Sequence, residues 1–379
     1  MKLIINTTTL SGTGVTQVAF SFIQECKSHL HNTYHIFLSP TLSKEIDKTS
    51  FPSNFYFYDF KGHPLYGLKG FFIRKKLKNL EKKINPDVVF TVFGPACWTP
   101  RSPHITGFAN SYYVYPESPF YKVIPWKEKM RIQLMKWAHR FFLKRNGQYF
   151  ICETQDMSQR LVKFLKINSN NVFTVSNTFN HFFENPNTEN LPVLLPKRRE
   201  GEFRIVSLAS LDIHKNLTVI NDVVPILEKK LPGNKVKFVL TVDENKFQTQ
   251  FNTLAKSKIV NLGRIPVKFC PQLYVESDVL FLPSLIESFS ANYPEAMKMK
   301  KPILTSNYSF ATSICGDAAS YFDPTNPNDI ADKIIELIAN KEKYDQLLEK
   351  GTIQLKNFGT AKTRASKYLE IFSIIKNKY

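Results

Sequence analysis

Cysteine is scarce in this sequence, and the long apolar runs that mark membrane spans are missing. The five cysteines among 379 residues are scattered, odd in number and never in a Cys-x-x-Cys spacing. This pattern argues against a disulfide framework or a zinc site and fits a reducing compartment. No run of roughly 18 uncharged apolar residues occurs, and the opening residues MKLIINTTTL lack the small-residue cleavage pattern of a signal peptide. The sequence therefore predicts a cytoplasmic protein that does not span a membrane.

Acidic residues are also few relative to basic ones. The 32 Asp and Glu stand against 51 Lys and Arg, which gives a formal net charge of +19. Such an excess favours a polyanionic neighbour, namely nucleic acid, an anionic membrane surface or a phosphorylated substrate. A solvated basic surface without a partner would give the same total. Nucleic acid is the weaker interpretation, because no recognition motif with interleaved aromatic residues is found.

The length and the apolar pattern predict the architecture. A chain of 379 residues with 43% hydrophobic content is globular and too long for one ordinary core. Short apolar runs alternate with amphipathic stretches throughout, which predicts parallel, doubly wound α/β sheets. Three prolines and mixed charges indicate a linker in the middle of the chain. We expect the parts to be an N-terminal domain at 1–181, the linker at 182–202, a C-terminal domain at 203–360 and a final helix at 361–379. A ligand cleft is expected at the carboxyl ends of the strands.

Two acids flank one such strand end, in LFLPSLIESFSANYPEAMKMKKPILTS at 280–306. Glu287 lies in the predicted loop after the strand, and Glu295 lies in the first turn of a helix that starts near Asn292. An ionised carboxylate accepts hydrogen bonds from two hydroxyl groups, so it suits the vicinal diol of a sugar or a ribose. The alternative is structural: Asn292 and Glu295 have the spacing of a capping box, and Glu287 would then be a solvated loop acid.

This region resembles a known family. The run PSLIESFSANYPEAM, followed by KKPILTS and ATSICGDAASYFDPTNPNDIADKI, is similar to the C-terminal half of the retaining glycosyltransferases of family four, also called glycosyl transferases group 1. The resemblance covers residues 283–330 and includes the Glu-x7-Glu pair of that family. It implies a GT-B fold, in which two Rossmann-like domains face each other across a cleft and the C-terminal helix crosses back to the N-terminal domain.

The resemblance also implies roles for individual residues. Glu287 would contact the transferred sugar, and Glu295 would contact the ribose of the nucleotide. The sequence has serines where the family has two loop glycines. The remaining donor-side loop residues are Ser288, Phe289, Ser290 and Ala291.

Further donor-side candidates lie outside that loop. Lys215, in SLASLDIHKNL, follows a strand and would place a cation on a diphosphate leaving group, where charge develops as the glycosidic bond breaks. The family has an Arg shortly before this Lys; this sequence has none there, and Arg264 is the candidate substitute. In SGTGV at 11–15, Gly14 and Gly12 would let the backbone approach the donor, although a tight βα turn explains them equally well.

Acceptor-side candidates lie in RSPHITGFANSYYVYPES at 101–118, and they are His104, Asn110, Tyr113 and Glu117. Ordinary packing is the alternative for the tyrosines. The resemblance implies transfer with retention, in which the departing phosphate takes the acceptor proton. No metal is expected, because Lys215 can neutralise the diphosphate and no acidic metal motif is present.

Two basic, amphipathic segments of the N-terminal half accompany these candidates, at 71–84 and 126–145. In the second, Trp126, Met130, Leu134, Trp137 and Phe141 recur at spacings of three or four, which is typical of a core face. Flanking Lys and Arg also suit an anionic membrane surface and a lipid-linked acceptor.

The sequence thus predicts a glycosyltransferase that moves a sugar from a nucleotide-sugar donor to a glycan or polyprenyl-linked glycan in surface polysaccharide synthesis, of capsule, lipopolysaccharide or exopolysaccharide. Two alternatives stay open: an inactive relative that binds glycans or membranes, and a nucleic-acid-binding protein.

Overall fold

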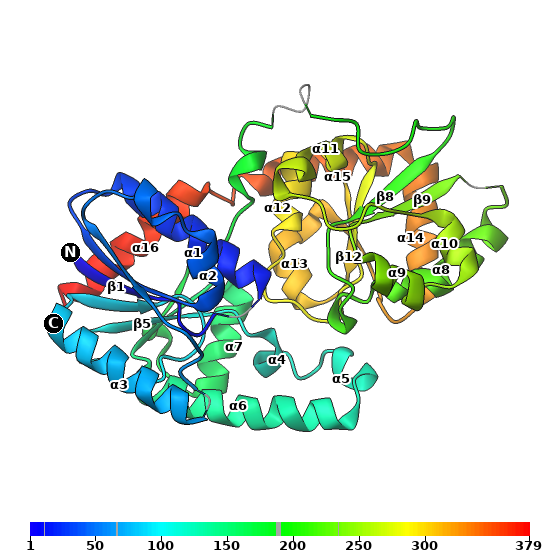
Figure 1. Cartoon of the computed structure of the whole chain (residues 1–379). Helices are drawn as coiled ribbons and strands as arrows, with labels where there is room; N and C mark the ends of the chain where they lie inside the picture. The colour runs from blue at the N-terminus through cyan, green and yellow to red at the C-terminus, as the bar shows by residue number, and fades with distance from the viewer. Residues whose placement is uncertain (11, 66, 187–190, 234) are drawn as a thin grey trace. The chain divides into compact units, whose positions relative to one another are not determined.

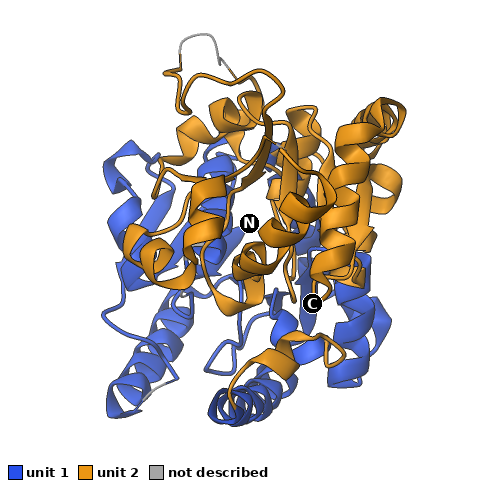
Figure 2. Ribbon diagram, turned by 90° about the vertical axis from the view of Figure 1, so that its right-hand side faces the viewer, with its two compact units in different colours: residues 1–114, 126–177, 361–379 blue, residues 115–125, 178–360 orange. Residues whose placement is uncertain are grey.

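A computed structural model describes residues 1–379 except 11, 66, 187–190 and 234 (Figure 1). The contacts divide the chain into two compact units, coloured separately in Figure 2. Unit 1 consists of residues 1–114, 126–177 and 361–379, and unit 2 consists of residues 115–125 and 178–360. Each unit is built on one parallel sheet, as the alternating apolar pattern predicts.

The sheet of unit 1 has seven parallel strands in the order β3-β2-β1-β4-β5-β6-β7. The central strands are short apolar runs with nearly every side chain buried, as expected where helices cover both faces of a parallel sheet. The strands are β1 (Lys2–Asn6), β2 (Thr33–Leu38), β3 (Phe55–Asp59), β4 (Val88–Thr91), β5 (His104–Phe108), β6 (Tyr149–Cys152) and β7 (Val172–Thr174).

The helices of unit 1 connect these strands. They are α1 (Thr13–Glu25), α2 (Pro40–Glu45), α3 (Gly67–Ile84), α4 (Ser111–Val114), α6 (Trp126–Asn146), α7 (Gln155–Leu165) and α16 (Ala361–Lys376). None of the helices among the described residues is long and apolar enough to cross a membrane.

The C-terminal helix α16 packs into unit 1, as the fold prediction requires. The rings of Tyr368 and Phe372 lie 5.2 Å from Phe22 and 4.9 Å from Phe90, respectively, measured between centroids. The buried guanidinium of Arg364 donates hydrogen bonds to Asn177 Oδ1 and Ser21 Oγ. Aromatic packing and these bonds together fix the last helix onto the sheet formed by the beginning of the chain.

The sheet of unit 2 has six parallel strands in the order β10-β9-β8-β11-β12-β13. Its strands are β8 (Phe203–Ser207), β9 (Val236–Leu240), β10 (Ile259–Asn261), β11 (Val279–Leu282), β12 (Ile303–Ser306) and β13 (Ala319–Phe322). Its helices are α5 (Phe120–Val123), α8 (Ile220–Lys230), α9 (Glu244–Gln250), α10 (Thr253–Lys258), α11 (Cys270–Val275), α12 (Asn292–Lys298), α13 (Ser309–Cys315), α14 (Pro327–Ala339) and α15 (Lys341–Leu355). Two short 3₁₀ turns, Ile213–Lys215 and Leu217–Val219, precede α8.

One segment of the predicted N-terminal domain belongs to unit 2. The hydroxyl of Ser118 donates a hydrogen bond to the carbonyl oxygen of Leu285 at 2.6 Å, and the ring of Tyr115 packs edge-on against Phe310. Residues 115–125 therefore fold with unit 2, which differs from the predicted N-terminal domain at 1–181.

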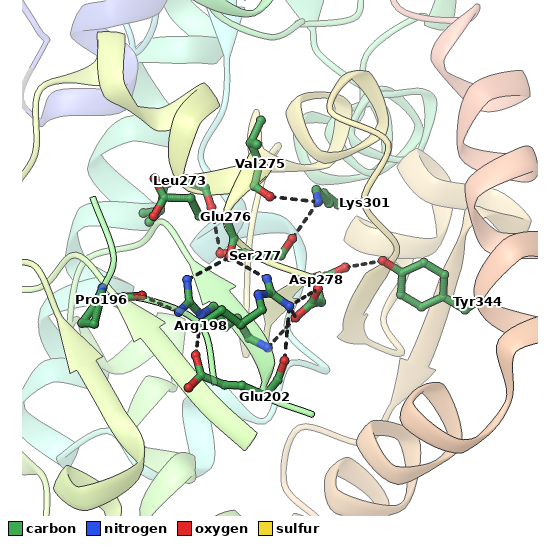
Figure 3. Close-up of polar contacts among 11 residues, drawn as sticks. Pro196, Arg198, Glu202, Leu273, Val275, Glu276, Ser277, Asp278, Lys301 and Tyr344 are labelled. Atoms are coloured by element: carbon green, nitrogen blue, oxygen red, sulfur yellow. Dashed lines mark hydrogen bonds and ion pairs between the residues drawn. The ribbon is translucent and has the colours of Figure 1, made fainter. Parts of the chain in front are cut away.

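Much of the predicted linker is fixed to unit 2 (Figure 3). Both carboxylate oxygens of Glu276 accept backbone N–H groups, from Leu194 at 2.9 Å and Leu195 at 2.7 Å. Arg198 reaches both oxygens of Asp278 at 2.8 and 2.7 Å. The same nitrogen, Nη1, makes both contacts, while Nη2 donates to the carbonyl oxygen of Glu276 at 2.9 Å, so this charged side chain ties the segment to unit 2. Part of the predicted linker, residues 187–190, lies outside the described residues.

Candidate functional site

The candidate site of unit 2 forms where two neighbouring strands end. Strands β8 and β11 pair in parallel, so the turn after β8 and the loop after β11 emerge at the same edge of the sheet. The backbone N–H of Leu285, in the second loop, donates to the carbonyl oxygen of His214, in the first, at 2.8 Å. This bond holds the two connections together, and it brings Lys215 close to Glu287.

Lys215 and Glu287 form an ion pair in which both side chains are mostly buried. The same carboxylate oxygen, Oε1 of Glu287, accepts a hydrogen bond from the hydroxyl of Ser284 at 3.1 Å. Asn216, next to Lys215, has a left-handed backbone with φ of 55°, and its amide donates to the carbonyl oxygen of Pro324 at 2.9 Å. The turn that carries Lys215 is thus fixed on both sides, and the cation is positioned by its surroundings.

Glu295 lies in a different electrostatic setting, in the first turn of α12. It is 7% exposed, and burial raises the pKa of Glu295 to about 7, while a hydrogen bond from the backbone N–H of Asn180 opposes the rise. Its surroundings include Cys270 and Tyr274 of α11, whose own pKa values its charge raises further. A buried acid without a nearby cation is expected to have a raised pKa, because burial penalises the charged form.

The capping-box alternative does not describe α12. The helix has no side-chain cap, because Ala291 precedes it and Asn292 is its first residue. The amide of Asn292 instead donates to the carbonyl oxygen of Leu208 at 2.8 Å, which joins α12 to the end of β8. Glu295 therefore has no role as a partner of Asn292.

The other predicted donor-side loop residues line the same connection. Ser288, Phe289 and Ala291 are half-buried, and Ser290 is buried. The ring of Phe289 meets that of Phe358 edge-on, with 6.2 Å between centroids. These residues lie between Glu287 and α12.

The remaining donor-side candidates lie elsewhere. Arg264 is exposed and follows β10, the edge strand, which β9 separates from β8. In unit 1, Gly12 precedes α1 with a positive φ of 104°, and Gly14 lies in the first turn of that helix; a Cβ added at either glycine would meet nothing within 4 Å. Ser11, of the same motif, lies outside the described residues.

The acceptor-side candidates of unit 1 are His104, Tyr113 and Asn110, and each has different contacts. His104 is buried in β5, where Nδ1 faces the carbonyl oxygen of Asn146 at 2.7 Å and burial lowers the pKa of His104 to about 4. Tyr113 is buried too, and its hydroxyl lies 3.1 Å from His139 Nδ1. Asn110 follows β5, and its Oδ1 is buried without a hydrogen-bond partner among the described residues.

Glu117 is the acceptor-side candidate that belongs to unit 2. It is exposed, and its neighbour Ser118 donates to Leu285, two residues before Glu287. Helix α5, which follows, packs beside the turn that carries Lys215. The structure thus brings Glu117 to the neighbourhood of the Lys215–Glu287 pair, while His104 and Tyr113 are interior residues of unit 1.

Three contributors were missed by sequence reasoning. Ser284 follows β11 after one intervening residue, Pro283, and this Pro-Ser pair offered a weak signal for a functional hydroxyl. The contacts of Ser118 and of the Asn180 backbone span long separations along the chain, to Leu285 and Glu295. Local sequence patterns do not predict contacts between residues so far apart in the chain.

The chain is similar to known proteins in part of its sequence and in its fold. Residues 196–354 match the family described as glycosyl transferases group 1. O-antigen chain mannosyltransferase B of Escherichia coli is 28% identical over 97 residues, which is 26% of this chain and 26% of that protein. The match thus spans about a quarter of the length of that relative.

Solved structures extend the similarity to the whole fold. The structure of HepE from Anabaena in complex with UDP and glucose aligns over 98% of this chain and 99% of that one, with a TM-score of 0.69 and 13% identity. WaaG, a glycosyltransferase involved in lipopolysaccharide biosynthesis, aligns over 98% and 99%, with a TM-score of 0.70 and 13% identity. The predicted GT-B fold is confirmed by these likenesses. The segment that is similar to the glycosyl transferases group 1 family, residues 196–354, carries Lys215, Glu287 and Glu295.

Proposed function

We propose that this protein transfers a sugar from a nucleotide-sugar donor to a glycan or lipid-linked glycan, with retention of anomeric configuration, in the synthesis of a surface polysaccharide. The observation that carries the proposal is the buried Lys215–Glu287 pair within the segment that matches the family. The similarity to an O-antigen mannosyltransferase and to WaaG supports a polysaccharide or lipopolysaccharide pathway.

In the proposed reaction, Lys215 stabilises the leaving group. The bond between the anomeric carbon and the diphosphate oxygen breaks, and the acceptor oxygen bonds to the same face of that carbon. The acceptor proton passes to the departing phosphate oxygen. Negative charge grows on the diphosphate during this step, so a fixed, half-desolvated ammonium lowers the barrier. The Lys215 ammonium has three N–H donors, so it can remain hydrogen-bonded to Glu287 while it also donates to a phosphate oxygen.

The two acids hold the donor at its two ends. One carboxylate oxygen of Glu287, Oε1, already accepts hydrogen bonds from Lys215 and Ser284. We propose that the other oxygen accepts hydrogen bonds from hydroxyls of the transferred sugar. Glu295 is proposed to receive the ribose diol. Two hydroxyl donors would stabilise its charged form, which burial now penalises. HepE, which has a similar structure, was solved in complex with UDP and glucose, and this supports a nucleotide-sugar donor.

On the acceptor side we propose Glu117 as a ligand for an acceptor hydroxyl, because its segment packs beside the Lys215 turn. Asn110 is a second candidate, since its Oδ1 can accept a hydroxyl donor that the protein does not supply. Transfer is proposed to need no metal, with Lys215 countering the diphosphate charge. The reaction is proposed to take place in the cytoplasm, at the inner face of the membrane.

The test is thermal unfolding of the full chain with a panel of nucleoside diphosphates and nucleotide sugars, followed by product analysis. A nucleotide at about 100 times its Kd should add roughly 2.7 kcal/mol to the free energy of unfolding. The anomeric proton of the product, measured by NMR against that of the donor, tests retention. Activity that persists in EDTA supports the metal-free proposal.

A matched control uses a second ion pair of unit 2. Glu336 and Lys343 pair between α14 and α15, and neither belongs to the candidate site. Glu287→Gln should abolish turnover, while Glu336→Gln should keep it. A chain that is stabilised by nucleotides but makes no product would support the glycan-binding alternative. A chain that no nucleotide stabilises, but that random DNA does, would overturn the proposal.

A further inference from the structure

Helix α6 carries a row of large apolar side chains that the fold does not bury. The exposed fractions are 69% for Trp126, 52% for Met130, 66% for Leu134, 74% for Trp137 and 50% for Phe141. Their spacings of four, four, three and four residues place them on one side of the helix. A contiguous exposed apolar surface of this kind marks an interaction site. We call these five residues the α6 stripe.

The α6 stripe is not the face by which α6 packs on unit 1. That face contains Ile132 and Leu143, which are buried, and His139, whose ring contacts the ring of Tyr113. At about 100° per residue, these positions lie on the side of the helix opposite the stripe. Sequence reasoning left a core face and a membrane face open for the stripe, and the structure shows that it is not core. Figure 1 shows α6 along the outer margin of unit 1.

Positive charge lies on both sides of the stripe. Helix α6 contains seven Lys and Arg but one acid, Glu128, which pairs with Arg131. The cations between the stripe and the buried face are Lys127, Arg131 and Arg145 on one side and Lys129, Lys136 and Arg140 on the other, with Lys144 within the stripe. Long basic side chains in such positions extend toward a polar boundary while their methylene groups cover apolar surface.

A hollow at the C-terminal part of α6 combines both features. It is lined by Trp137, Arg140, Phe141, Lys144 and Arg145. The guanidinium of Arg145 lies 5.9 Å from the ring centre of Phe141. Two aromatic rings among three cations suit a ligand with a phosphate beside apolar chains.

The beginning of α3 repeats the pattern on the same margin of unit 1 in Figure 1. Leu68, Phe71 and Phe72 are exposed there. Seven lysines and arginines occur in α3, against one acid, the buried Glu81. The basic, apolar character therefore extends beyond one helix.

We propose that α6 docks on a membrane surface that contains anionic lipids. The helix lies in the plane of the interface, the α6 stripe enters the boundary between headgroups and acyl chains, and the flanking cations contact lipid phosphates. The positive flanks favour a bilayer over a second copy of this basic chain, whose own flanks would repel it. A lipid-linked acceptor, as in the proposed function, would be reached on that surface, but the docking itself requires no sugar transfer.

Vesicle binding by the full chain tests the proposal without any nucleotide. We expect at least tenfold tighter binding to vesicles of phosphatidylcholine with phosphatidylglycerol than to phosphatidylcholine alone, with binding weakened by salt. Tryptophan fluorescence reports the contact directly. Of the three tryptophans, Trp98 is buried, so a blue shift and loss of quenching by acrylamide on anionic vesicles would come from Trp126 and Trp137.

Two pairs of variants separate the apolar and electrostatic parts. The double variant Leu134→Ser with Trp137→Ser should lower the affinity for anionic vesicles at least tenfold, whereas Val193→Ser with Ile353→Ser, at exposed apolar positions of unit 2, should leave it unchanged. Lys144→Glu with Arg145→Glu should remove the preference for anionic lipid, whereas Lys350→Glu with Lys356→Glu, also exposed in unit 2, should keep it. An unchanged melting temperature shows that each variant is folded.

Three results would overturn the docking proposal. The first is equal binding to neutral and anionic vesicles, and the second is equal binding by the α6 variants and the unit 2 controls. The third is a dimer in solution that the Leu134→Ser, Trp137→Ser variant converts to monomer, which would make the stripe an interface between copies. Stabilisation by nucleotides, measured on the same variants, reports separately on the donor site, so failure of docking and failure of the proposed sugar transfer are told apart.

Discussion

Glu287 and Glu295 belong to one connection between a strand and a helix, yet their surroundings are opposite. Glu287 is paired with Lys215 and accepts the Ser284 hydroxyl. Glu295 is equally buried, and burial raises its pKa to about 7, while the backbone N–H of Asn180 opposes that rise. The charge of Glu287 is thus compensated inside the protein, whereas the charge of Glu295 is compensated little until a ligand supplies hydroxyl donors.

The difference follows from the fold. Strand β8 pairs with β11, so the turn after β8 delivers Lys215 to the loop that carries Glu287. Glu295 lies in the first turn of α12, beside α11, which contributes a thiol and a phenol and no cation. The same residue type therefore has two different surroundings, which fits the proposed roles of Glu287 as a contact for Lys215 and the sugar and of Glu295 as a contact for the ribose diol.

The largest expected effect comes from removing Lys215, the cation that compensates the charge of Glu287. Lys215→Ala should lower kcat roughly a hundredfold or more, because a fixed donor to developing charge is lost. Steady-state kinetics on the donor found by the nucleotide panel measures it. Lys343→Ala, which breaks the ion pair with Glu336 between α14 and α15, should keep kcat. A Lys215→Ala enzyme within about threefold of wild type would show that the leaving group does not depend on this cation.

The second prediction concerns Glu295→Gln, which changes the acid whose charge the protein compensates little. A neutral amide accepts hydroxyl donors more weakly than a carboxylate, so we expect the Kd of the nucleoside diphosphate to rise roughly 30-fold, about 2 kcal/mol. Isothermal titration with wild type and variant measures this. Glu287→Gln should weaken the same nucleotide far less, since Glu287 is proposed to contact the sugar. Equal losses in the two variants would contradict the division of roles.

The pH dependence of stability tests the raised pKa of Glu295. The pKa of Glu295 in the folded protein, about 7, lies above its usual value of 4.5, so the folded state holds a proton that the unfolded state releases. The stability from this group is present below pH 4.5 and is lost as pH rises through 7. Glu295→Gln should therefore be more stable than wild type at pH 8, by on the order of 1 kcal/mol, and should show no gain at pH 4.5.

Glu336 supplies the opposite case for that experiment. Its hydrogen bond from Lys343 holds its pKa below the usual range, so its contribution to stability is lost as pH falls. Urea unfolding of Glu295→Gln and Glu336→Gln across pH 4 to 8 should give slopes that differ from wild type in opposite directions. A Glu295→Gln profile parallel to that of wild type would mean that the acid is charged at neutral pH without a ligand.

The alternation of apolar runs with amphipathic stretches predicted both sheets, because the central strands of each sheet are buried apolar runs. The pairing of Lys215 with Glu287 was not predicted as a contact, since 72 residues separate them and the bond depends on which strands are neighbours. The Glu-x7-Glu spacing located both acids but not their opposite electrostatics, which depend on α11 and on the backbone near Asn180.

Elsewhere the local pattern was insufficient. The spacing of the α6 stripe predicts an apolar face but does not say which of two opposite apolar faces the protein covers. Residues 115–125 carry no composition change that would assign them to unit 2; the contacts of Tyr115 and Ser118 decide it. The acidic partners of 194–202 lie about 80 residues further along, so that segment read as a linker.

The smallest expected effect concerns the hydrogen bond from Ser284 to Glu287. Ser284→Ala removes one of the two partners of Oε1 while Lys215 remains, so kcat should fall about threefold and stability by about 1 kcal/mol. Ser306→Ala is a matched control, because that buried hydroxyl ends the next strand and donates to the carbonyl oxygen of Leu282 rather than to a carboxylate. If both variants lose stability but Ser284→Ala alone loses turnover, the orientation of Glu287 depends on its hydroxyl partner as well as on the ion pair. If turnover is equal in the two, Lys215 alone holds the carboxylate, and the effect of Lys215→Ala would then include a displaced Glu287 as well as a lost cation.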